Sequence, residues 1–374
     1  MQRPRGTHDH ATARSDATGR ADGRAPRAEP SLPPGRTVYL PGRGSTFVRE
    51  IEGPPGAPAL LLLHGWTVTA DLNFYGAYAA LGRRFRVIAA DHRGHGRGVR
   101  SSGPFTLEDA ADDAAALARE LGIERCIAVG YSMGGAVAQL LWRRHPQLVD
   151  GLVLCATAGV FNDSREESLR FLGLSGLAGL ARAAPDTARK WLADQYLLRK
   201  GRHYEDWALE ELSRLDLAAQ LEAGAALGRF SSLDWLGEID VPTSVVVTAA
   251  DQVVPMRRQV QLFESIPTAQ AYRVDGPHDA IASRSESFVP MLLTAATSVA
   301  ERARHASANA TMGDDLAAAA ADDDAEAEVE AEADVGVDVD VEAGVRTSAR
   351  RADAATRPKF SARTPQGSRR RADR

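Results

Sequence analysis

The feature that most constrains this sequence is an alternation of short apolar runs with longer segments of helical periodicity between residues 37 and 155. Four of the runs are almost continuous in Ala, Val, Ile and Leu, which is typical of strands buried on both faces of a parallel sheet. Helices that cross over between such strands produce a doubly wound α/β sheet. We therefore predict an α/β domain built on a mostly parallel sheet.

The same patterns place the individual elements along the chain. Strands are predicted at 37–40, 46–51, 59–63, 86–90, 125–129, 151–155, 243–248 and 271–274, the first two as an antiparallel pair. Helices are predicted at 74–83, 106–121, 134–145, 257–265 and 286–302. The alternation stops after residue 157, and residues 160–236, which include several aromatic side chains, are predicted to form a helical lid insertion.

Composition restricts the folded domain to residues 37–304. Residues 1–36 contain no aromatic residue and no apolar run, so we expect a disordered N-terminal tail. We expect a second disordered tail at 305–374, with thirteen acidic and no basic residues in 314–342, then ten basic and two acidic residues in 346–374. Solvated tails are the simplest interpretation, and a basic arm that contacts nucleic acid or a membrane is the alternative.

Several classes of protein are disfavoured by what the sequence lacks. There is no apolar run long enough to cross a bilayer and no apolar segment near residue 1, so a soluble cytoplasmic protein is expected. Cys126 and Cys155 each lie in a predicted buried strand, where a thiol packs as a small apolar side chain, and no disulfide is expected. The formal net charge of −5 does not indicate a polyanionic partner, and the oligomeric state stays open.

The most informative motif is a G-x-S-x-G turn centred on Ser132, which follows one predicted strand directly and opens a predicted helix. A nucleophile in such a turn adopts strained backbone angles, and the small residues Gly130 and Gly134 let the strand and the helix approach each other. The N–H group of Met133, at the start of the helix, is then aimed at the charge that develops on a substrate. The context predicts a nucleophile elbow rather than a glycine-rich turn with an inert serine.

A second segment, His64-Gly65-Trp66, follows the predicted strand at 59–63. Loops at the carboxyl ends of parallel strands form the ligand crevices of open α/β sheets. We predict that the backbone N–H of Trp66 is a second donor to an oxyanion, opposite that of Met133. His64 is interpreted as a structural residue that holds this loop by a hydrogen bond.

A serine nucleophile needs a base, and the base needs an orienting carboxylate. Asp251 and His278 follow two later predicted strands, in the chain order Ser, Asp, His that this arrangement uses. Asp275 and Asp279 flank His278 and would have to fold back sharply, while Asp240 precedes its strand instead of following it. Asp251 is therefore the predicted partner of the histidine.

These segments together resemble the α/β-hydrolase superfamily over nearly all of residues 37–304. The resemblance rests on the elbow at 130–135, the loop at 64–66 and the segments 251–255 and 276–280. The segment Asp91 to Arg97 resembles the D-x-R-G-x-G loop of lactonase, esterase and C–C-hydrolase members, although Gly98 departs from the serine often found next. Its Asp91, His92 and His95 are too few to predict a metal site, and neither a metal nor a cofactor is expected.

The resemblance implies a serine hydrolase that cleaves a carboxylic ester or lactone through an acyl-enzyme on Ser132. A serine at the elbow argues against the dehalogenases and epoxide hydrolases of the superfamily, whose elbow carries an aspartate. C–C bond hydrolysis and acyl transfer use the same three residues and remain alternatives. A third alternative is a non-catalytic ligand-binding protein whose charged tails recruit a partner. The expected partner of the site is a small-molecule acyl substrate, which the insertion would select.

Overall fold

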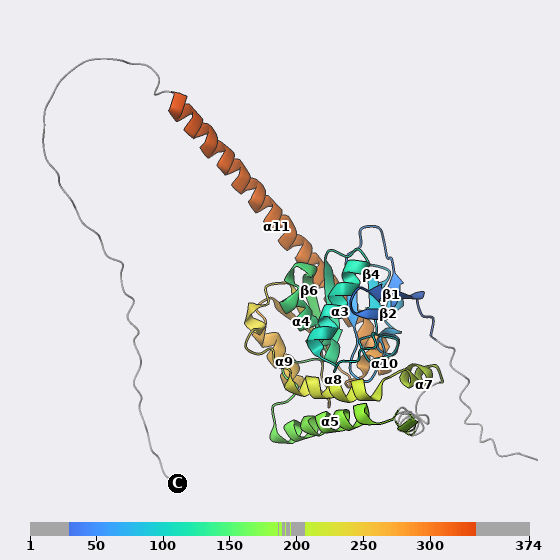
Figure 1. The fold of residues 1–374 in the computed structure, drawn as a ribbon. Coiled ribbons are helices and arrows are strands. Elements are labelled where there is room, and N and C mark those ends of the chain that lie inside the picture. The colour runs from blue at the N-terminus through green and yellow to red at the C-terminus, as the bar shows by residue number, and fades with distance from the viewer. Residues whose placement is uncertain (1–29, 186, 189–190, 192–194, 196–205, 334–374) are drawn as a thin grey trace, which may run out of the picture. The chain divides into compact units, whose positions relative to one another are not determined.

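The computed structural model describes residues 30–185, 187–188, 191, 195 and 206–333 (Figure 1). Contacts divide the chain into two units, 1–312 and 313–374. The sheet and every site described below belong to the first unit. The basic segment at 346–374 and most of the predicted N-terminal tail lie outside the described residues.

The first unit is built on one eight-stranded sheet in the order β1-β2-β4-β3-β5-β6-β7-β8. The strands are β1 (Gly35–Leu40), β2 (Gly44–Ile51), β3 (Ala59–Leu63), β4 (Arg86–Ala90), β5 (Cys126–Tyr131), β6 (Val149–Cys155), β7 (Thr243–Thr248) and β8 (Ala269–Val274). Only the pairings of β2 with β1 and with β4 are antiparallel. The predicted mostly parallel sheet and its antiparallel first pair are confirmed.

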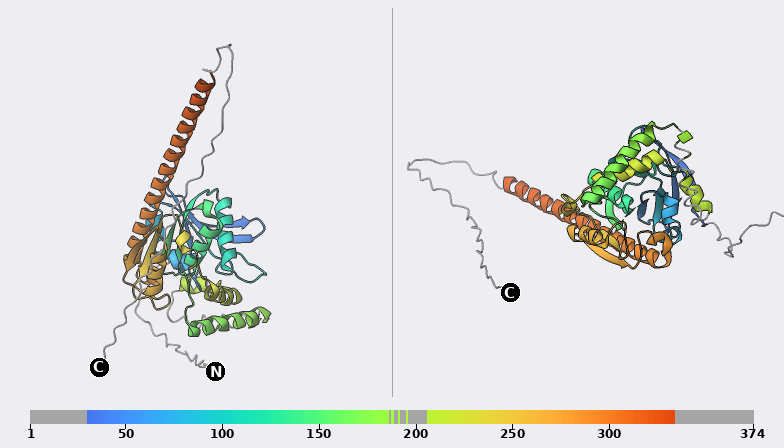
Figure 2. Two further views of the ribbon diagram at one scale, coloured as in Figure 1. Left: turned by 90° about the vertical axis from the view of Figure 1, so that its left-hand side faces the viewer. Right: turned by 90° about the horizontal axis from the view of Figure 1, so that it is seen from below.

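Helices cover both faces of the sheet, and each face has its own apolar core (Figures 1 and 2). One face is covered by α3 (Leu107–Glu120), α4 (Met133–Arg144) and α9 (Met256–Ser265). The other is covered by α1 (Ala70–Phe74), α2 (Tyr78–Leu81), α10 (Ala280–Ser283) and the first turns of α11 (Ser285–Ala333). Short 3₁₀ turns lie at Pro146–Leu148 and Leu236–Glu238. This double covering explains why the central strands are apolar on both sides.

Two predicted helices differ from the observed ones. The helix predicted at 74–83 is split into α1 and α2, because the chain turns at Gly76, where an added Cβ would lie 3.1 Å from that of Ser285. The final helix, predicted to end at residue 302, continues to Ala333 as α11. Residues 305–333, predicted to be disordered, are therefore helical, since alanine and glutamate are strong helix formers even in a segment of like charge.

The helical insertion lies between β6 and β7 and contains α5 (Arg165–Ala183), α7 (Asp206–Ser213) and α8 (Leu217–Arg229). Both Figures 1 and 2 show α8 next to the sheet domain and α5 on its outer side. A β-bridge between Val160 and Ser231 closes the base of the insertion. Its helical character agrees with the sequence prediction.

Two further expectations concern the described part of the chain. Cys126 and Cys155 are buried and free. None of the described helices combines the length and the apolar character needed to span a bilayer.

Candidate active site

Ser132 stands at the tip of a tight turn between β5 and α4. Its backbone angles are φ +53° and ψ −116°, a conformation that is strained for a residue with a side chain. Three hydrogen bonds hold it there: its N–H donates to the carbonyl of Cys155 (2.9 Å), and its carbonyl accepts from the Thr157 hydroxyl (2.7 Å) and the Gly135 N–H (2.9 Å). The turn presents the serine side chain at the N-terminus of α4.

Glycines on either side of Ser132 are required by close backbone contacts. A Cβ at Gly130 would lie 2.3 Å from the carbonyl oxygen of Gly134. A Cβ at Gly134 would lie 1.9 Å from the carbonyl oxygen of Leu63, at the end of β3. Strand, helix and neighbouring strand therefore meet at a distance that only glycine permits, as the sequence predicts for an elbow.

The structure brings together the three side chains that the sequence singled out. His278 follows β8, and its Nε2 lies 2.9 Å from Oγ of Ser132. On the other side of the ring, Nδ1 lies 2.7 Å from Oδ2 of Asp251, which follows β7. The hydroxyl, the imidazole and the carboxylate thus form a continuous chain of hydrogen bonds.

Asp251 is held as a buried acceptor. Its Oδ1 accepts the backbone N–H groups of Val253 and Val254, both at 2.8 Å, and its Oδ2 accepts the Thr248 hydroxyl at 2.8 Å. Burial on its own raises the pKa of this carboxyl, but the hydrogen bond and charge of His278, with those backbone and hydroxyl donors, outweigh burial and lower the pKa below its usual value. Asp251 is therefore an anion that can stabilise a positively charged imidazole.

The loop after β3 lies directly beside Ser132, and its peptide groups are fixed from several sides. The Gly65 N–H donates to Oδ1 of Asn73 (2.7 Å), and the Gly65 carbonyl lies 2.7 Å from Nδ1 of His64. Nε2 of His64 accepts the His92 N–H (2.8 Å), so the ring proton is on Nδ1 and is donated to Gly65. The Trp66 N–H belongs to the same planar peptide as that carbonyl and points the opposite way, so His64 fixes its direction.

The rival carboxylates lie away from His278. Asp275 is exposed and pairs with Arg273 on the surface (2.8 Å), and Asp279 is exposed as well. Asp240 accepts the indole N–H of Trp142 (3.3 Å). These positions agree with the choice of Asp251.

The segment from Asp91 to Gly98 is an ordered loop after β4. Asp91 accepts two backbone N–H groups, from Ala70 and from Arg97, both at 2.8 Å. Burial raises the pKa of this carboxyl to about 6. A Cβ at Gly98 would lie 2.1 Å from the carbonyl oxygen of His92, so the serine often found here in the superfamily would not fit this turn.

Three buried histidines gather under these loops. The ring centroids of His92 and His95 lie 4.3 and 5.2 Å from that of His64. Burial lowers the pKa of His92 to about 3 and that of His95 to about 4. Among the described residues, no group of His, Cys, Asp or Glu side chains is arranged to hold a metal ion. The rings are packed as neutral groups.

The insertion contacts the loop after β3 through Trp66. The indole N–H of Trp66 donates to the carbonyl of Gln220 in α8 (2.7 Å). An added Cβ at Gly224 would lie 2.6 Å from the Trp66 ring and 2.7 Å from Leu174 of α5. The ring is therefore enclosed by both helices, and the insertion is connected to the residue that supplies a predicted oxyanion donor.

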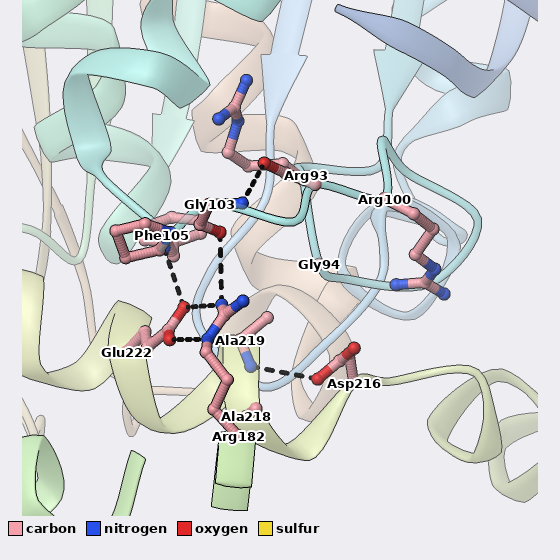
Figure 3. Close-up of a pocket in the computed structure, with 12 residues that line it drawn as sticks. Arg93, Gly94, Arg100, Gly103, Phe105, Arg182, Asp216, Ala218, Ala219 and Glu222 are labelled. Carbon is pink, nitrogen blue, oxygen red and sulfur yellow. Dashed lines mark hydrogen bonds and ion pairs between the residues drawn. The ribbon is translucent and has the colours of Figure 1, made fainter. Parts of the chain in front are cut away.

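A second connection surrounds a pocket of about 130 Å³ beside the first turn of α8 (Figure 3). Arg182 of α5 forms an ion pair with Glu222 of α8 (2.6 Å), and Glu222 accepts the N–H of Phe105 (2.8 Å). Arg182 also donates to the carbonyl of Ser102 (2.9 Å). Ser132 does not line this pocket, whose polar groups tie the insertion to the loop before α3.

The aromatic residues of the insertion pack against one another and against the sheet domain. The observed ring pairs are Trp207 with Tyr75, Phe230 with Phe161 and Trp235 with Trp142. Trp191 is exposed, and Tyr196 lies outside the described residues. In the described pairs these aromatic residues serve core packing.

Three supporting residues were not singled out from the sequence. Gln259 of α9 donates to the Thr248 hydroxyl (2.9 Å) and to Asp251 (3.3 Å), and Asn73 accepts the N–H of Gly65 in the loop after β3. Tyr131 donates to the carbonyl of His278. Tyr131 precedes the nucleophile and could have been suspected from its place in the motif, whereas the other two carry no local signal.

Comparison with known proteins identifies a family and several related chains. Residues 58–206 match the sequence profile of the alpha/beta hydrolase fold family. A pimeloyl-[acyl-carrier protein] methyl ester esterase from Aromatoleum aromaticum is 32% identical over 231 residues, which cover 58% of this chain and 89% of that protein. A putative carbamate hydrolase from Yersinia enterocolitica is 32% identical over 229 residues, covering 58% of this chain and 79% of that protein.

A solved structure shows the same fold at lower identity. The enol-lactonase from Burkholderia xenovorans superposes with a TM-score of 0.57 at 23% identity, over 70% of this chain and all of that one. At this identity the likeness concerns the fold alone.

Proposed function

Because the chain belongs to the α/β-hydrolase family, we propose that it is a serine hydrolase that cleaves a carboxylic ester or lactone through an acyl-enzyme on Ser132. The observation that carries the proposal is the hydrogen-bonded series of Asp251, His278 and Ser132, with separations of 2.7 and 2.9 Å. A hydroxyl, an imidazole and a buried carboxylate in this order form the arrangement that activates a serine at neutral pH.

In the proposed reaction, Nε2 of His278 takes the hydroxyl proton as Oγ of Ser132 attacks the acyl carbonyl. Asp251 holds the proton of Nδ1 and stabilises the imidazolium. The protonated histidine then gives its proton to the departing alcohol oxygen, which leaves an acyl-enzyme. Water attacks the acyl carbon with His278 again as base, and the acid is released as the hydroxyl of Ser132 regains its proton.

The N–H groups of Met133 and Trp66 are the proposed oxyanion donors. The first N–H groups of α4 have no partner within their own helix, and the N-terminus of a helix favours negative charge. The Trp66 N–H is aimed by the fixed peptide of Gly65. Losing one such donor typically lowers kcat by about 10²- to 10³-fold.

Ester cleavage is favoured among reactions of this triad because the esterase from Aromatoleum aromaticum is similar over most of its length. C–C bond hydrolysis and acyl transfer would use the same side chains and are separate outcomes of the substrate test. A purely ligand-binding role does not require the contact between His278 and Ser132.

The test is hydrolysis of p-nitrophenyl esters of graded acyl length and of an aliphatic lactone, compared with a ring-cleavage β-diketone acid. Wild type should hydrolyse at least one ester or lactone, and Ser132→Ala should lose that activity. Ser102→Ala, which changes an exposed serine, is the matched control and should keep it. Turnover of the diketone acid alone would replace the ester assignment by C–C hydrolysis, and equal activity of wild type and Ser132→Ala would exclude the proposed nucleophile.

A further inference from the structure

Helix α5 exposes an apolar stripe on its outer face. Four leucines of this helix, with exposed fractions between 53% and 70%, point away from α8: Leu169, Leu172, Leu177 and Leu180. Ala178 and Ala181, on the other face of the helix, are buried. From residue 171 to residue 181 the helix contains no charged residue. An apolar surface of this kind on a soluble chain indicates a binding surface.

The stripe also contains two glycines that leave room for a second backbone. An added Cβ at Gly173 or Gly176 would meet nothing within 4 Å, so neither glycine is required by a contact inside this chain. Glycine in the middle of a helix costs about 0.5–1 kcal/mol relative to alanine. Two such residues along the exposed stripe allow close approach of another helix.

The stripe is symmetric about the midpoint between positions 174 and 175. Three pairs of residues lie at equal distances on either side of that midpoint: Leu169 and Leu180, Leu172 and Leu177, and Gly173 and Gly176. In an antiparallel pair of identical helices, residue i contacts residue j of the partner and j contacts i. The sequence of the stripe is therefore complementary to itself about a twofold axis.

We propose that the outer face of α5 is a dimer interface in which two copies of this chain pack their α5 helices antiparallel, with Leu169 against Leu180 and Leu172 against Leu177. The acidic side chains of the first turn and Arg182 of the last turn already form ion pairs within this chain, so the apolar stripe itself carries the proposed interface.

A lipid surface is the other occupant that exposed leucines could fit. An interfacial membrane helix has Lys and Arg on its polar face. Helix α5 contains no lysine and three arginines: Arg170 is paired with Glu166 at 2.5 Å, Arg182 is paired with Glu222, and Arg165 at the first position forms no ion pair with a described residue. The polar face of the helix thus offers a single unpaired positive charge, Arg165, rather than the several that favour a membrane, and self-association is the better match.

The interface is small, so a weak and concentration-dependent dimer is expected. Sedimentation velocity should show an increase in mass from about 1 μM to about 200 μM, the range in which small interfaces dissociate. Leu172→Glu should raise the dissociation constant at least about tenfold, because it places a charge in the seam. Leu233→Glu, which changes an exposed leucine outside α5, is the matched control and should dimerise like wild type.

The antiparallel register is tested by cysteine pairing. Leu169→Cys mixed with Leu180→Cys should form a disulfide at least about tenfold faster than either variant alone, since the twofold axis brings these positions together. The native cysteines are buried and do not compete. Circular dichroism of each variant establishes that it is folded.

Three results would overturn the proposal. One is a wild-type mass that stays monomeric at every concentration. Another is Leu169→Cys pairing with itself as fast as with Leu180→Cys. The third is a monomer that binds phosphatidylcholine vesicles through leucines whose replacement abolishes that binding, which would assign the face to lipid.

Discussion

The site at the sheet edge and the helical insertion above it are held by different kinds of contact. The elbow is held by close backbone contacts. A Cβ added at Gly134 would lie 1.9 Å from the carbonyl oxygen of Leu63, and Ser132 is fixed by three hydrogen bonds. In the insertion, Gly176 faces open space. The proposed catalytic serine therefore lies where the backbone can hardly move, whereas α5 of the insertion has room for a larger side chain.

Several of the contacts between the insertion and the sheet domain are ion pairs of arginine side chains. Arg258 of α9, 2% exposed, pairs with Asp163 and with Glu167 at the start of α5 (2.6 Å to Glu167). At the other side, Arg97 pairs with Glu211 of α7 (3.3 Å). These ion pairs join long side chains whose conformations can adjust, whereas the elbow is held by backbone contacts.

The largest expected effect is on kcat, and it distinguishes Asp251 from the other carboxylates near His278. Asp251→Asn should lower kcat by about 10⁴-fold, because the amide cannot stabilise the imidazolium and favours the wrong ring tautomer. Asp275→Asn and Asp279→Asn are the controls, and each should change kcat by less than about threefold. Steady-state kinetics on the best ester checks this, and a large loss at Asp279 instead would assign the carboxylate role there.

A methyl group added to the elbow at Gly134 should strongly destabilise the fold. Gly134→Ala forces Leu63 and the start of α4 apart, so we expect a loss of about 3 kcal/mol or more in the free energy of unfolding, together with loss of activity. Urea unfolding followed by tryptophan fluorescence measures the change. A variant as stable as wild type would contradict the close contact described for β3 and α4.

As the pH falls, the loops that contain His92 and His95 should be destabilised before the ion pairs that hold the insertion are lost. His92 and His95 have folded-state pKa values of about 3 and about 4, below the value of about 6.5 in the unfolded chain, so the unfolded state binds more protons below pH 6.5. Asp91, with its pKa raised to about 6, acts in the opposite direction between pH 6 and its unfolded value. The carboxylates of Asp163 and Glu167 have lowered pKa values because arginines pair with them, and Arg258 is common to both.

The net result is a loss of about 2 kcal/mol or more of unfolding free energy between pH 7.5 and pH 5, since three buried histidines, including His64, whose pKa burial also lowers, outweigh one aspartate. Urea titrations at the two pH values measure it. His92→Gln should reduce the difference, whereas His145→Gln, at a half-buried histidine paired with Asp112, is the control. A protein that is more stable at pH 5 would show that the aspartate dominates.

The smallest effect has the opposite sign and lies in the insertion. Gly179→Ala adds a methyl group to an exposed position of α5 that has nothing within 4 Å. Alanine should stabilise the helix by about 0.5–1 kcal/mol, which slows hydrogen exchange of α5 amides by up to about fivefold. A faster exchange would mean that the glycine is required by a contact.

The sheet could be predicted from the sequence because its signals are local. The run of leucines in β3 and the motif around Ser132 each predict their structure from a few neighbouring residues. The assignments of Asp251 and His278 needed only their places after strands, since parallel strands end at one edge of the sheet.

What could not be predicted depends on contacts between distant segments. The role of Asn73 requires the loop of Gly65 to lie beside it, and the division of the helix near Gly76 requires α11 to pack there. The outward direction of Leu172 could not be derived either, because an apolar residue in a helix predicts burial and does not say against what. The extension of α11 shows that like charge alone does not exclude a helix.

The most direct test of the central claim is labelling with a fluorophosphonate probe followed by peptide mapping. A serine activated by His278 should carry one adduct, on the peptide that contains Ser132, and His278→Ala should abolish it. An unlabelled folded wild type, or an adduct on a different serine, would contradict the claim that these side chains form a working nucleophile.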